Sequence, residues 1–452
     1  SVLFSDRLNT FKAISKEAIE KGGLISHWQG NKLYIVAADP AFAEHLLKTC
    51  LEKDDSVRFF RTLLQDGSIF APVPIWRPRR KILAPTFSPK NLNAFVKVFA
   101  QQSGILADQL KTVVGKGAFS AWKFMTTYTM DSVCQTTLGI HTNSQLQPEQ
   151  PFLQAFEDCT RIDAKRVCQP WLYNDTVYQH FCNKEYQLQT HSINVMWSFM
   201  DQVIQSKRDA LQKECLESNK NQTPKDNMKT FLELLIEAAS GDKGYSNMEL
   251  REETLVLVLA GTDTSAVGAA FTLMMLAKHP DVQDKVYEEL QEIFEGSETV
   301  TAEHLPHLKY LDAVIRETLR LYPPVPFIVR KVTKDVTLPS SVTVVEGCGL
   351  FISIWGIHRN PRYWGDDAEQ FRPERFLEPL QHPAAFMPFS HGPRACLGYQ
   401  YAMMSMKTAL ATVLRRYRVL PSDEKSTAGE LRVSFDIMMK DVDNFKIQLA
   451  MR

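Results

Sequence analysis

The sequence predicts a mainly α-helical protein with minor β-structure. Apolar side chains recur at helical spacing through most of residues 40–280. Short β-prone segments appear near the start of the chain and again after residue 335. No internal repeat is present, so we expect one large domain over residues 1–452.

A hairpin and a helix are the first predicted elements. Two short strands are expected within residues 24–36, around Gly30-Asn31, a dipeptide suited to a tight turn. Asp39 can cap the next helix, and Pro40 fits its first turn. The last of three loops is either a domain boundary or, as we expect, a surface connection within one domain. The loops cover residues 71–74, 142–151 and 217–229.

The middle and the end of the chain supply the remaining elements. A helix is expected to begin near Pro78, because proline is unfavourable inside a helix. A long helix is expected over residues 254–278, although the sequence Ala-Gly-Thr-Asp-Thr-Ser at 260–265 contains residues that bend or bulge helices. Two strands and a final helix are expected at 341–345, 350–354 and 399–416.

Composition excludes several classes of protein. The 52 basic and 52 acidic residues give no basic excess, so nucleic acid is not an expected partner. The 26 Phe, 13 Tyr and 7 Trp residues exclude a disordered chain. Eight scattered cysteines, without CxxC pairs, are expected to be reduced. No run of about 18 apolar residues is present to span a bilayer.

One cysteine stands in an unusual sequence. Cys396 lies within Phe-Ser-His-Gly-Pro-Arg-Ala-Cys-Leu-Gly, residues 389–398, directly before the last predicted helix. Helix amides and the nearby Arg394 favour the thiolate, which is both a nucleophile and a metal ligand. Gly392 and Gly398 allow a tight turn and close approach to a flat cofactor. The alternative for any single cysteine is a buried structural thiol.

The full pattern from Phe389 to Gly398 resembles the cysteine loop of the cytochrome P-450 family of haem-thiolate proteins. The resemblance covers essentially the whole chain and implies that family's fold, a helical bundle around haem with small β-sheets. It also implies that Cys396 is the axial ligand of the iron of haem b. Residues 316–326 and 358–361 resemble insect members of the microsomal type that are related to fatty-acid hydroxylases.

A second matching motif places an acid and a base three residues apart on one helix. Glu317 and Arg320 can pair, and a surface pair of this kind is worth under about 1 kcal/mol. The resemblance implies instead a buried structural pair, completed by Arg375, that holds the cysteine loop in place.

The third match lies at the centre of the long helix. Asp263 and Thr264 need a reason there, because an unpaired buried polar group costs about 1–3 kcal/mol. A local helix kink is one explanation. The resemblance implies that Asp263 and Thr264 deliver protons during oxygen activation, and that Gly261 leaves room for oxygen.

The carboxylates of the haem need cations. The resemblance implies that Trp76, Arg80, Arg330 and Arg394 contact the haem propionates, for which the forked guanidinium is suited. Two of the four cations within residues 77–81 are expected to be solvated. Near residue 305, His304 and His307 lack a third ligand, so zinc is not expected.

An apolar substrate pocket is expected from family position. It suits a lipophilic molecule such as a fatty acid, semiochemical, hormone or xenobiotic. Several relatives carry a Glu at the position of Ala260 that esterifies a haem methyl, so its absence predicts non-covalent haem. The expected pocket residues are Phe59, Phe60, Ile69, Phe70, Val256, Leu259, Ala260, Val325, Phe327, Ile328, Phe435, Ile437 and Met438.

Electrons must come from another protein, because no Gly-rich dinucleotide motif or flavin module is present. We expect NADPH-cytochrome P-450 reductase as the donor, with cytochrome b5 assisting. The resemblance implies a catalytic domain on the cytosolic surface of the endoplasmic reticulum membrane, with an N-terminal anchor missing from this chain. The acidic reductase surface is expected to meet Arg79, Lys81, Lys407 and Arg415.

Two other functions are alternatives to oxygenation. One is a haem-binding sensor or carrier without turnover, and the other is an oxygen-independent isomerase or dehydratase. Asp263 and Thr264 argue against both, because neither function needs proton delivery to dioxygen.

Overall fold

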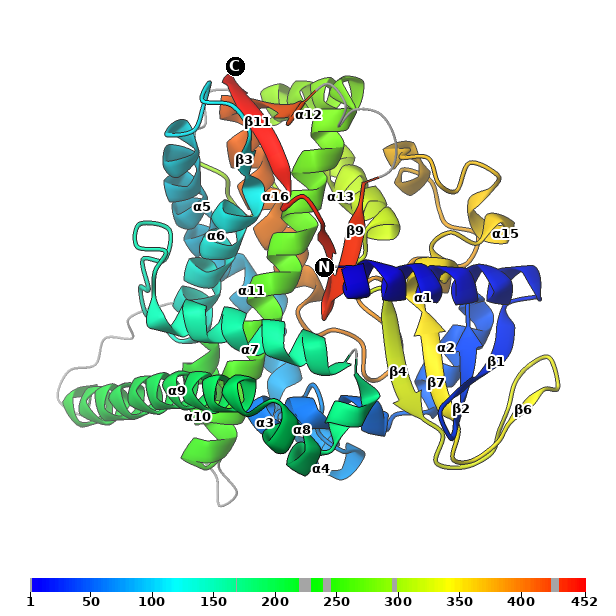
Figure 1. Cartoon of the computed structure of the whole chain (residues 1–452). Helices are drawn as coiled ribbons and strands as arrows, with labels where there is room; N and C mark the ends of the chain where they lie inside the picture. The colour runs from blue at the N-terminus through cyan, green and yellow to red at the C-terminus, as the bar shows by residue number, and fades with distance from the viewer. Residues whose placement is uncertain (1, 168, 219–228, 239–244, 295–298, 424–430) are drawn as a thin grey trace.

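The computed structural model describes the chain except residues 1, 168, 219–228, 239–244, 295–298 and 424–430. Most of the expected polar loop at 217–229 therefore lies outside the described residues. The predicted mainly helical class is confirmed, with small sheets at the edges of a helical body (Figure 1).

The first half of the chain is almost entirely helical. Asp39 caps α2 by accepting hydrogen bonds from the backbone N–H groups of Ala41 and Phe42, as predicted. The elements are α1 (Val2–Glu20), α2 (Pro40–Thr49), η1 (Asp55–Phe60), α3 (Arg61–Leu64), α4 (Val73–Leu83), η2 (Ala84–Phe87), α5 (Pro89–Lys111), α6 (Ala121–Thr137), α7 (Pro151–Val167), η3 (Pro170–Tyr173), α8 (Asp175–Phe181) and α9 (Asn183–Ser218).

The second half contains the long central helix and the helix that follows the cysteine. The final helix has the bounds that the sequence predicts. The elements are α10 (Phe231–Ala238), α11 (Asn247–Lys278), α12 (Pro280–Ile293), α13 (Lys309–Leu321), α14 (Ile354–Ile357), α15 (Pro361–Trp364), η4 (Pro373–Phe376), η5 (Pro383–Ala385) and α16 (Tyr399–Arg416).

Four small sheets complete the described structure. The predicted hairpin is present, with Gln29 paired to Lys32 across the Gly30-Asn31 turn. The larger sheet has the order β1 (Leu24–Gln29), β2 (Lys32–Ala37), β7 (Gly349–Ser353) and β4 (Phe327–Lys331). The others are β3 (Phe119–Ser120) with β11 (Lys446–Met451) and β8 (Tyr417–Pro421), β9 (Val433–Asp436) with β10 (Met438–Asp441), and β5 (Val336–Thr337) with β6 (Thr343–Val344).

Helix α11 runs through the middle of the helical body, against α6, α13 and α16 (Figure 1). A side chain at Gly268 would place its Cβ 2.9 Å from Met406 Sδ and 3.3 Å from Leu319 Cδ2, so glycine allows this close packing. Among the described residues α11 alone is long and apolar enough to cross a membrane. Its most apolar window is 78% buried inside the protein, which is typical of a core helix.

The sequence around residues 260–265 does not interrupt α11. The hydroxyls of Thr262 and Thr264 donate to the carbonyl oxygens of Val258 and Ala260, at 2.7 and 2.6 Å. These bonds to the preceding turn satisfy the polar side chains without breaking the helix. The expected bulge is therefore absent.

The predicted start of α4 near Pro78 is wrong. The helix begins at Val73, five residues earlier, and Pro78 lies inside it. Pro74 near the start of the helix is well suited to the first turn, where no N–H partner is needed. Pro78 removes one backbone N–H from the ladder, a cost that the rest of the helix tolerates.

Candidate functional site

The cysteine loop is held by its own backbone just before α16. The N–H of Cys396 donates to Phe389 O at 2.9 Å, and Gly398 is the N-cap residue of the helix. Gly392 adopts φ +75°, and a Cβ there would lie 2.9 Å from Leu47 O. Glycine at 392 is therefore required both by its conformation and by the close approach of α2.

The Cys396 side chain retains exposed surface although protein atoms surround it. Burial raises the pKa of its thiol, while the Gly398 N–H and the guanidinium of Arg80 lower it. The helix amide acts as expected. The cation that assists is Arg80 rather than Arg394, which points elsewhere.

Arg80 and Arg394 join the cysteine loop to α4. The Nη1 of Arg80 donates to Ala395 O at 2.7 Å. The guanidinium of Arg394 lies 4.3 Å from the ring centre of Trp76 and donates to Ala71 O at 2.7 Å. Three of the four side chains expected around the haem propionates, Trp76, Arg80 and Arg394, thus converge next to Cys396.

Arg330 on β4 completes a cluster of buried cations. Its residue is 1% exposed, and Nη1 donates to the neighbouring Val329 O at 2.9 Å. The Nε atoms of Arg330 and Arg394 are buried without a hydrogen-bond partner. Burial lowers the pKa of both guanidinium groups to about 10. The charge of Arg394 lowers the pKa of Arg330 further, whereas the pKa of Arg394 is raised by Glu52 and lowered by Arg80.

None of Arg80, Arg330 and Arg394 pairs with a carboxylate within 4.0 Å among the described residues. Buried charges are normally paired, so among the described residues this cluster lacks a carboxylate in direct contact, although the charge of Glu52 acts on Arg394 from further away. A group with two carboxylates and a metal that binds sulfur fits these donors, as haem does.

Lys53 is a further cation that sequence reasoning missed. Burial and the charges of Arg330 and Arg394 hold the pKa of its amine well below the usual value. The backbone N–H of Lys331 donates to Glu52 O at 3.0 Å, which brings the segment beside β4. In the sequence Glu-Lys-Asp-Asp this lysine has the character of a solvated surface residue, so no local signal could have found it.

The central turn of α11 presents a partly exposed face inside a buried helix. Ala260, Gly261 and Thr264 keep partial exposure, whereas Asp263 is 4% exposed. A Cβ at Gly261 would lie 3.0 Å from Val133 Cγ2 on α6. Glycine here serves the close crossing of α6 and α11, and the expected room for oxygen beside Gly261 stays a prediction.

The acid and base on α13 form a buried pair rather than a surface one. Glu317 and Arg320 are both 0% exposed, and two bonds of 2.7 and 2.8 Å join them. Nε of Arg375 lies 3.5 Å from the Glu317 carboxylate. Arg320 also donates to His358 O and Ala368 O, which ties α13 to the segment before the cysteine loop.

His358 reinforces the same connection and was not singled out as a site residue from the sequence. Its Nε2 accepts the N–H of Met387 at 2.9 Å, and its Nδ1 lies 3.1 Å from Arg320 O. Burial lowers the pKa of this imidazole to about 3. A neutral ring that donates from Nδ1 and accepts at Nε2 satisfies both contacts.

The expected pocket residues form two aromatic groups. Phe60 stacks on Phe70 with centroids 4.9 Å apart, and Phe59 packs behind Phe60 at 4.5 Å. In the second group, Phe327 and Phe435 lie 4.7 Å apart, and Phe327 also packs against Phe351 at 4.5 Å. Phe59 is 4% exposed, so it packs in the core behind the first group.

Two of the expected reductase contacts are wrong. The Arg79 side chain is 8% exposed and lies within 3.4 Å of three carboxylates. The Lys407 side chain is 13% exposed and pairs with Asp312 at 2.9 Å. The period of α4 and α16 turns both side chains inward, whereas Lys81 is exposed.

A helical body, a cysteine before a helix and a cluster of buried arginines beside it fit the class of haem-thiolate proteins. The family model described as Cytochrome P450 matches residues 2–444. The chain belongs to the cytochrome P-450 family.

Curated relatives agree with this assignment. Cytochrome P-450 4c3 of Drosophila melanogaster is 31% identical over 95% of this chain and 82% of its own length. Probable cytochrome P-450 4s3 of the same species is 33% identical over 90% of this chain and 82% of its length. Human cytochrome P-450 4V2 is 32% identical over 84% of this chain and 73% of its length.

The predicted enzyme class is confirmed. The chain is a haem-thiolate monooxygenase that acts on lipophilic substrates and receives electrons from a reductase. The sensor or carrier and the isomerase or dehydratase are not supported.

Proposed function

We propose that the haem is haem b, held non-covalently, with the Cys396 thiolate on its iron. The observation that supports this placement is the set of buried guanidinium groups without a carboxylate partner among the described residues. When bound, the haem supplies reductive activation of dioxygen and transfer of one oxygen atom to the substrate. The propionate contacts are Trp76, Arg80, Arg330 and Arg394, with Lys53 added.

Asp263 and Thr264 of α11 handle protons in this proposal. Thr264 is partly exposed on the face that it shares with Ala260, and its hydroxyl donates to Ala260 O. The oxygen of that hydroxyl can still accept a hydrogen bond from water or from a reacting group. Asp263 directly precedes Thr264 in the chain, and its carboxyl can supply the proton.

The substrate is a lipophilic molecule that lies between the two aromatic groups of the pocket. Phe60 with Phe70 and Phe327 with Phe435 supply apolar ring surface from distant parts of the chain. Fatty acids, semiochemicals, hormones and xenobiotics are all lipophilic molecules that suit this apolar pocket. With Ala260 in α11, the chain has no carboxylate there to esterify the haem.

The electron source is NADPH through cytochrome P-450 reductase, with cytochrome b5 assisting, and the location is the endoplasmic reticulum membrane. Large apolar side chains on η3 and α8 support contact with a membrane surface, because Trp171 is 63% exposed and Phe181 is 76% exposed.

The spectrum of the reduced carbon monoxide complex tests the haem placement. Wild type should show the red-shifted Soret band that defines the family, and Cys396→Ser should lose it while keeping the helical fold. Cys50→Ser is the matched control and should keep the band. Persistence of the band in Cys396→Ser would remove Cys396 as the iron ligand.

Turnover and substrate are tested separately. Thr264→Ala should lower product formation about a hundredfold relative to oxygen consumed if it supports proton delivery. A panel of fatty acids, terpenoids and insecticides, screened by the spin-state shift of the haem, should identify the substrate class. Unchanged coupling in Thr264→Ala would contradict the role given to that hydroxyl.

A further inference from the structure

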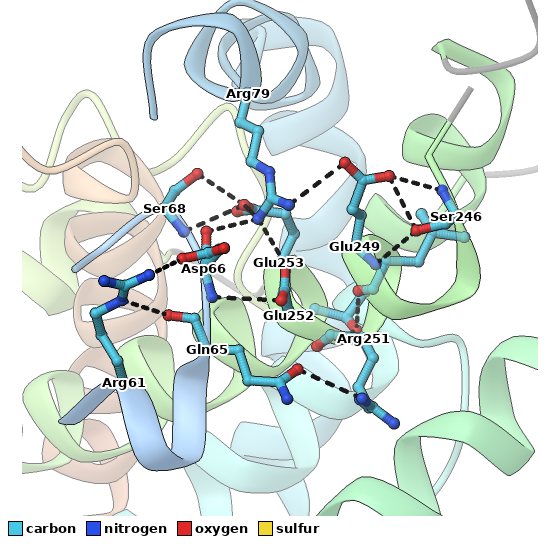
Figure 2. A network of polar contacts seen from close by, with 12 residues as sticks. Arg61, Gln65, Asp66, Ser68, Arg79, Ser246, Glu249, Arg251, Glu252 and Glu253 are labelled. Carbon is cyan, nitrogen blue, oxygen red and sulfur yellow. Dashed lines mark hydrogen bonds and ion pairs between the residues drawn. The ribbon is translucent and has the colours of Figure 1, made fainter. Parts of the chain in front are cut away.

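A buried polar network joins α4, α11 and the loop that connects α3 to α4 (Figure 2). At its centre, Nη1 of Arg79 lies 2.8 Å from Glu252 Oε2 and 3.1 Å from Glu253 Oε1. Nη2 of Arg79 lies 3.4 Å from Glu249 Oε1. We call Arg79 with these three glutamates the Arg79 network.

The Arg79 network is charged and largely excluded from water. The side chains of Arg79, Glu252 and Glu253 are 8%, 4% and 0% exposed. Removal of one partner from such a site leaves an uncompensated buried charge, which is strongly unfavourable. Neighbouring Arg77 on α4 is exposed and takes no part.

The part of the molecule that this network holds is the α3–α4 loop, residues 65–71. The backbone N–H of Asp66 donates to Glu252 Oε1 at 3.3 Å, and Asp66 O accepts from Arg79 at 2.6 Å. The N–H and the hydroxyl of Ser68 donate to Glu253 Oε1 at 3.1 and 2.9 Å. The loop is thus fixed through its main chain to two helices.

Glycine in the same loop allows it to lie directly on α11. A Cβ at Gly67 would be 2.6 Å from Val256 Cγ2 and 3.0 Å from Glu252 O. No larger residue fits without moving the loop away from the helix. The close approach of Gly67 to α11 and the hydrogen bonds of Asp66 and Ser68 therefore hold the same part of the loop.

The same loop also carries two expected pocket residues and supports an arginine of the cysteine loop. Ile69 is 36% exposed, and Phe70 stacks on Phe60. The carbonyl oxygens of Ser68 and Ala71 accept from Arg394 at 3.4 and 2.7 Å. A change in the position of this loop would move Phe70 and the acceptors of Arg394 together.

We propose that Arg79 and Glu253 are positioning residues that hold the α3–α4 loop against α11 and so set the access of ligands to the haem iron. The proposal rests on the proposed function, since the pocket in question is the substrate pocket. Neither residue touches substrate in this arrangement. They act through Ser68 and Phe70.

The two oxygens of Glu253 have unequal surroundings. Oε1 accepts from Ser68 N, Ser68 Oγ and Arg79, whereas Oε2 is buried without a hydrogen-bond partner. Burial raises the pKa of this carboxyl to about 7, although the hydrogen bonds from Ser68 and the charge of Arg79 lower it. The closed loop therefore favours the protonated acid.

Other charged or titratable groups face this site from each neighbouring element. Glu249 and Glu252 lie on α11 itself, Arg79 comes from α4, and Asp66 from the loop is paired with Arg61 of α3. Tyr245, just before α11, has its pKa raised by burial and by the charge of Glu253.

The direction of the pH effect follows from these contacts. When the loop opens, water reaches Glu253 and its pKa falls toward the ordinary value of 4.5. The closed form then binds the proton more tightly than the open form, so low pH closes the loop and a rise through pH 7 favours opening.

Hydrogen exchange of the haem-bound protein tests the network without turnover. Arg79→Met should lower the protection factors of the Asp66 and Ser68 amides about tenfold or more. Arg77→Met, the same change two residues earlier on α4 and outside the network, should leave them unchanged. Equal protection in both variants would overturn the proposal.

Glu253→Gln keeps an acceptor for Ser68 and removes the ionisable group, so it tests the proposal even if Arg79→Met does not fold. In wild type, loop protection and the exclusion of neutral 4-phenylimidazole from the iron, corrected for the protonation of the ligand itself, should weaken as pH rises through about 7. In Glu253→Gln both should be independent of pH, while binding of the smaller imidazole changes little. A pH dependence that persists in the variant would overturn the role of Glu253.

The two proposals fail differently. If the haem placement is wrong, wild type lacks the thiolate signature of the carbon monoxide complex, whatever the loop does. If the network does not hold the loop, that signature is intact and the protection factors do not respond to Arg79→Met or Glu253→Gln.

Discussion

His358 shows how one residue makes the stability of this protein depend on pH. Its imidazole is 0% exposed, and burial lowers its pKa from 6.5 to about 3. Between these values the unfolded chain binds one more proton than the folded chain. The contribution of His358 to stability is therefore fully present above pH 6.5 and is lost as the pH falls.

We expect His358→Gln to flatten this dependence. From about pH 7.5 to about pH 5.5 the protonation of this group alone should cost wild type about 1.4 kcal/mol in the free energy of unfolding. Urea unfolding at both pH values, compared between wild type and His358→Gln, measures it. His27→Gln, at an exposed histidine, is the control and should match wild type. Parallel slopes in all three proteins would contradict the burial of a neutral imidazole.

Lys53 is expected to act in opposite directions on the haem-free and haem-bound protein. Its amine is buried near Arg330 and Arg394, so the haem-free chain contains excess positive charge there. Lys53→Met should stabilise the haem-free protein and weaken haem retention about tenfold, because a charge-assisted hydrogen bond to a propionate is lost.

Transfer of haem to apomyoglobin measures retention without turnover. The control is Lys81→Met on α4, which removes an exposed lysine. Haem loss at the wild-type rate in Lys53→Met would show that this amine does not contact the propionates.

At the scale of elements, the packing of α6 against α11 depends on Gly261. Alanine would gain about 1 kcal/mol in helix propensity but would bring its Cβ to 3.0 Å from Val133 Cγ2. We expect the clash to dominate in wild type, because a packed core does not yield easily. In a Val133→Ala background Gly261→Ala should be more favourable by about 1 kcal/mol, measured as the coupling energy of a double-mutant cycle. A coupling near zero would contradict this packing role.

Elements were predictable where a local signal determines them. The cap at Asp39, the Gly30-Asn31 turn and the bounds of α16 all follow from adjacent residues. The start of α4 was predicted wrongly from Pro78, because the lost hydrogen bond and the ring clash of a proline disfavour a helix but do not always end it. The predicted bulge in α11 is absent because the hydroxyls of its threonines donate to carbonyl oxygens of the same helix.

At the scale of the whole molecule, the candidate site was predictable through motifs but not through contacts between distant segments. The pairing of Glu317 with Arg320 follows from their spacing, and the approach of Arg394 to Trp76 follows from family position. The burial of Arg79 against α11 and the place of Lys53 beside β4 depend on how the chain returns on itself, which no local pattern encodes.

The burial of Arg79 and Lys407 also changes the expected reductase surface, because both side chains form ion pairs inside the protein. Among the exposed cations of α4, Arg77 and Lys81 remain for an acidic partner. We expect Lys81→Glu to slow the first electron transfer from reductase about tenfold at low salt, and the difference to shrink as salt screens the charges. Stopped-flow reduction under carbon monoxide, at several ionic strengths, measures this.

Lys116→Glu makes the same change in net charge at an exposed lysine after α5, away from α4, and separates a local surface from overall charge. Reductase should reduce this variant at nearly the wild-type rate. Electrostatic attraction between the two proteins depends on charges within about a Debye length of their contact, roughly 10 Å at moderate salt. If both variants slow reduction equally, overall charge governs the encounter and α4 is not the contact surface. If neither slows it at low salt, the attraction does not involve Lys81.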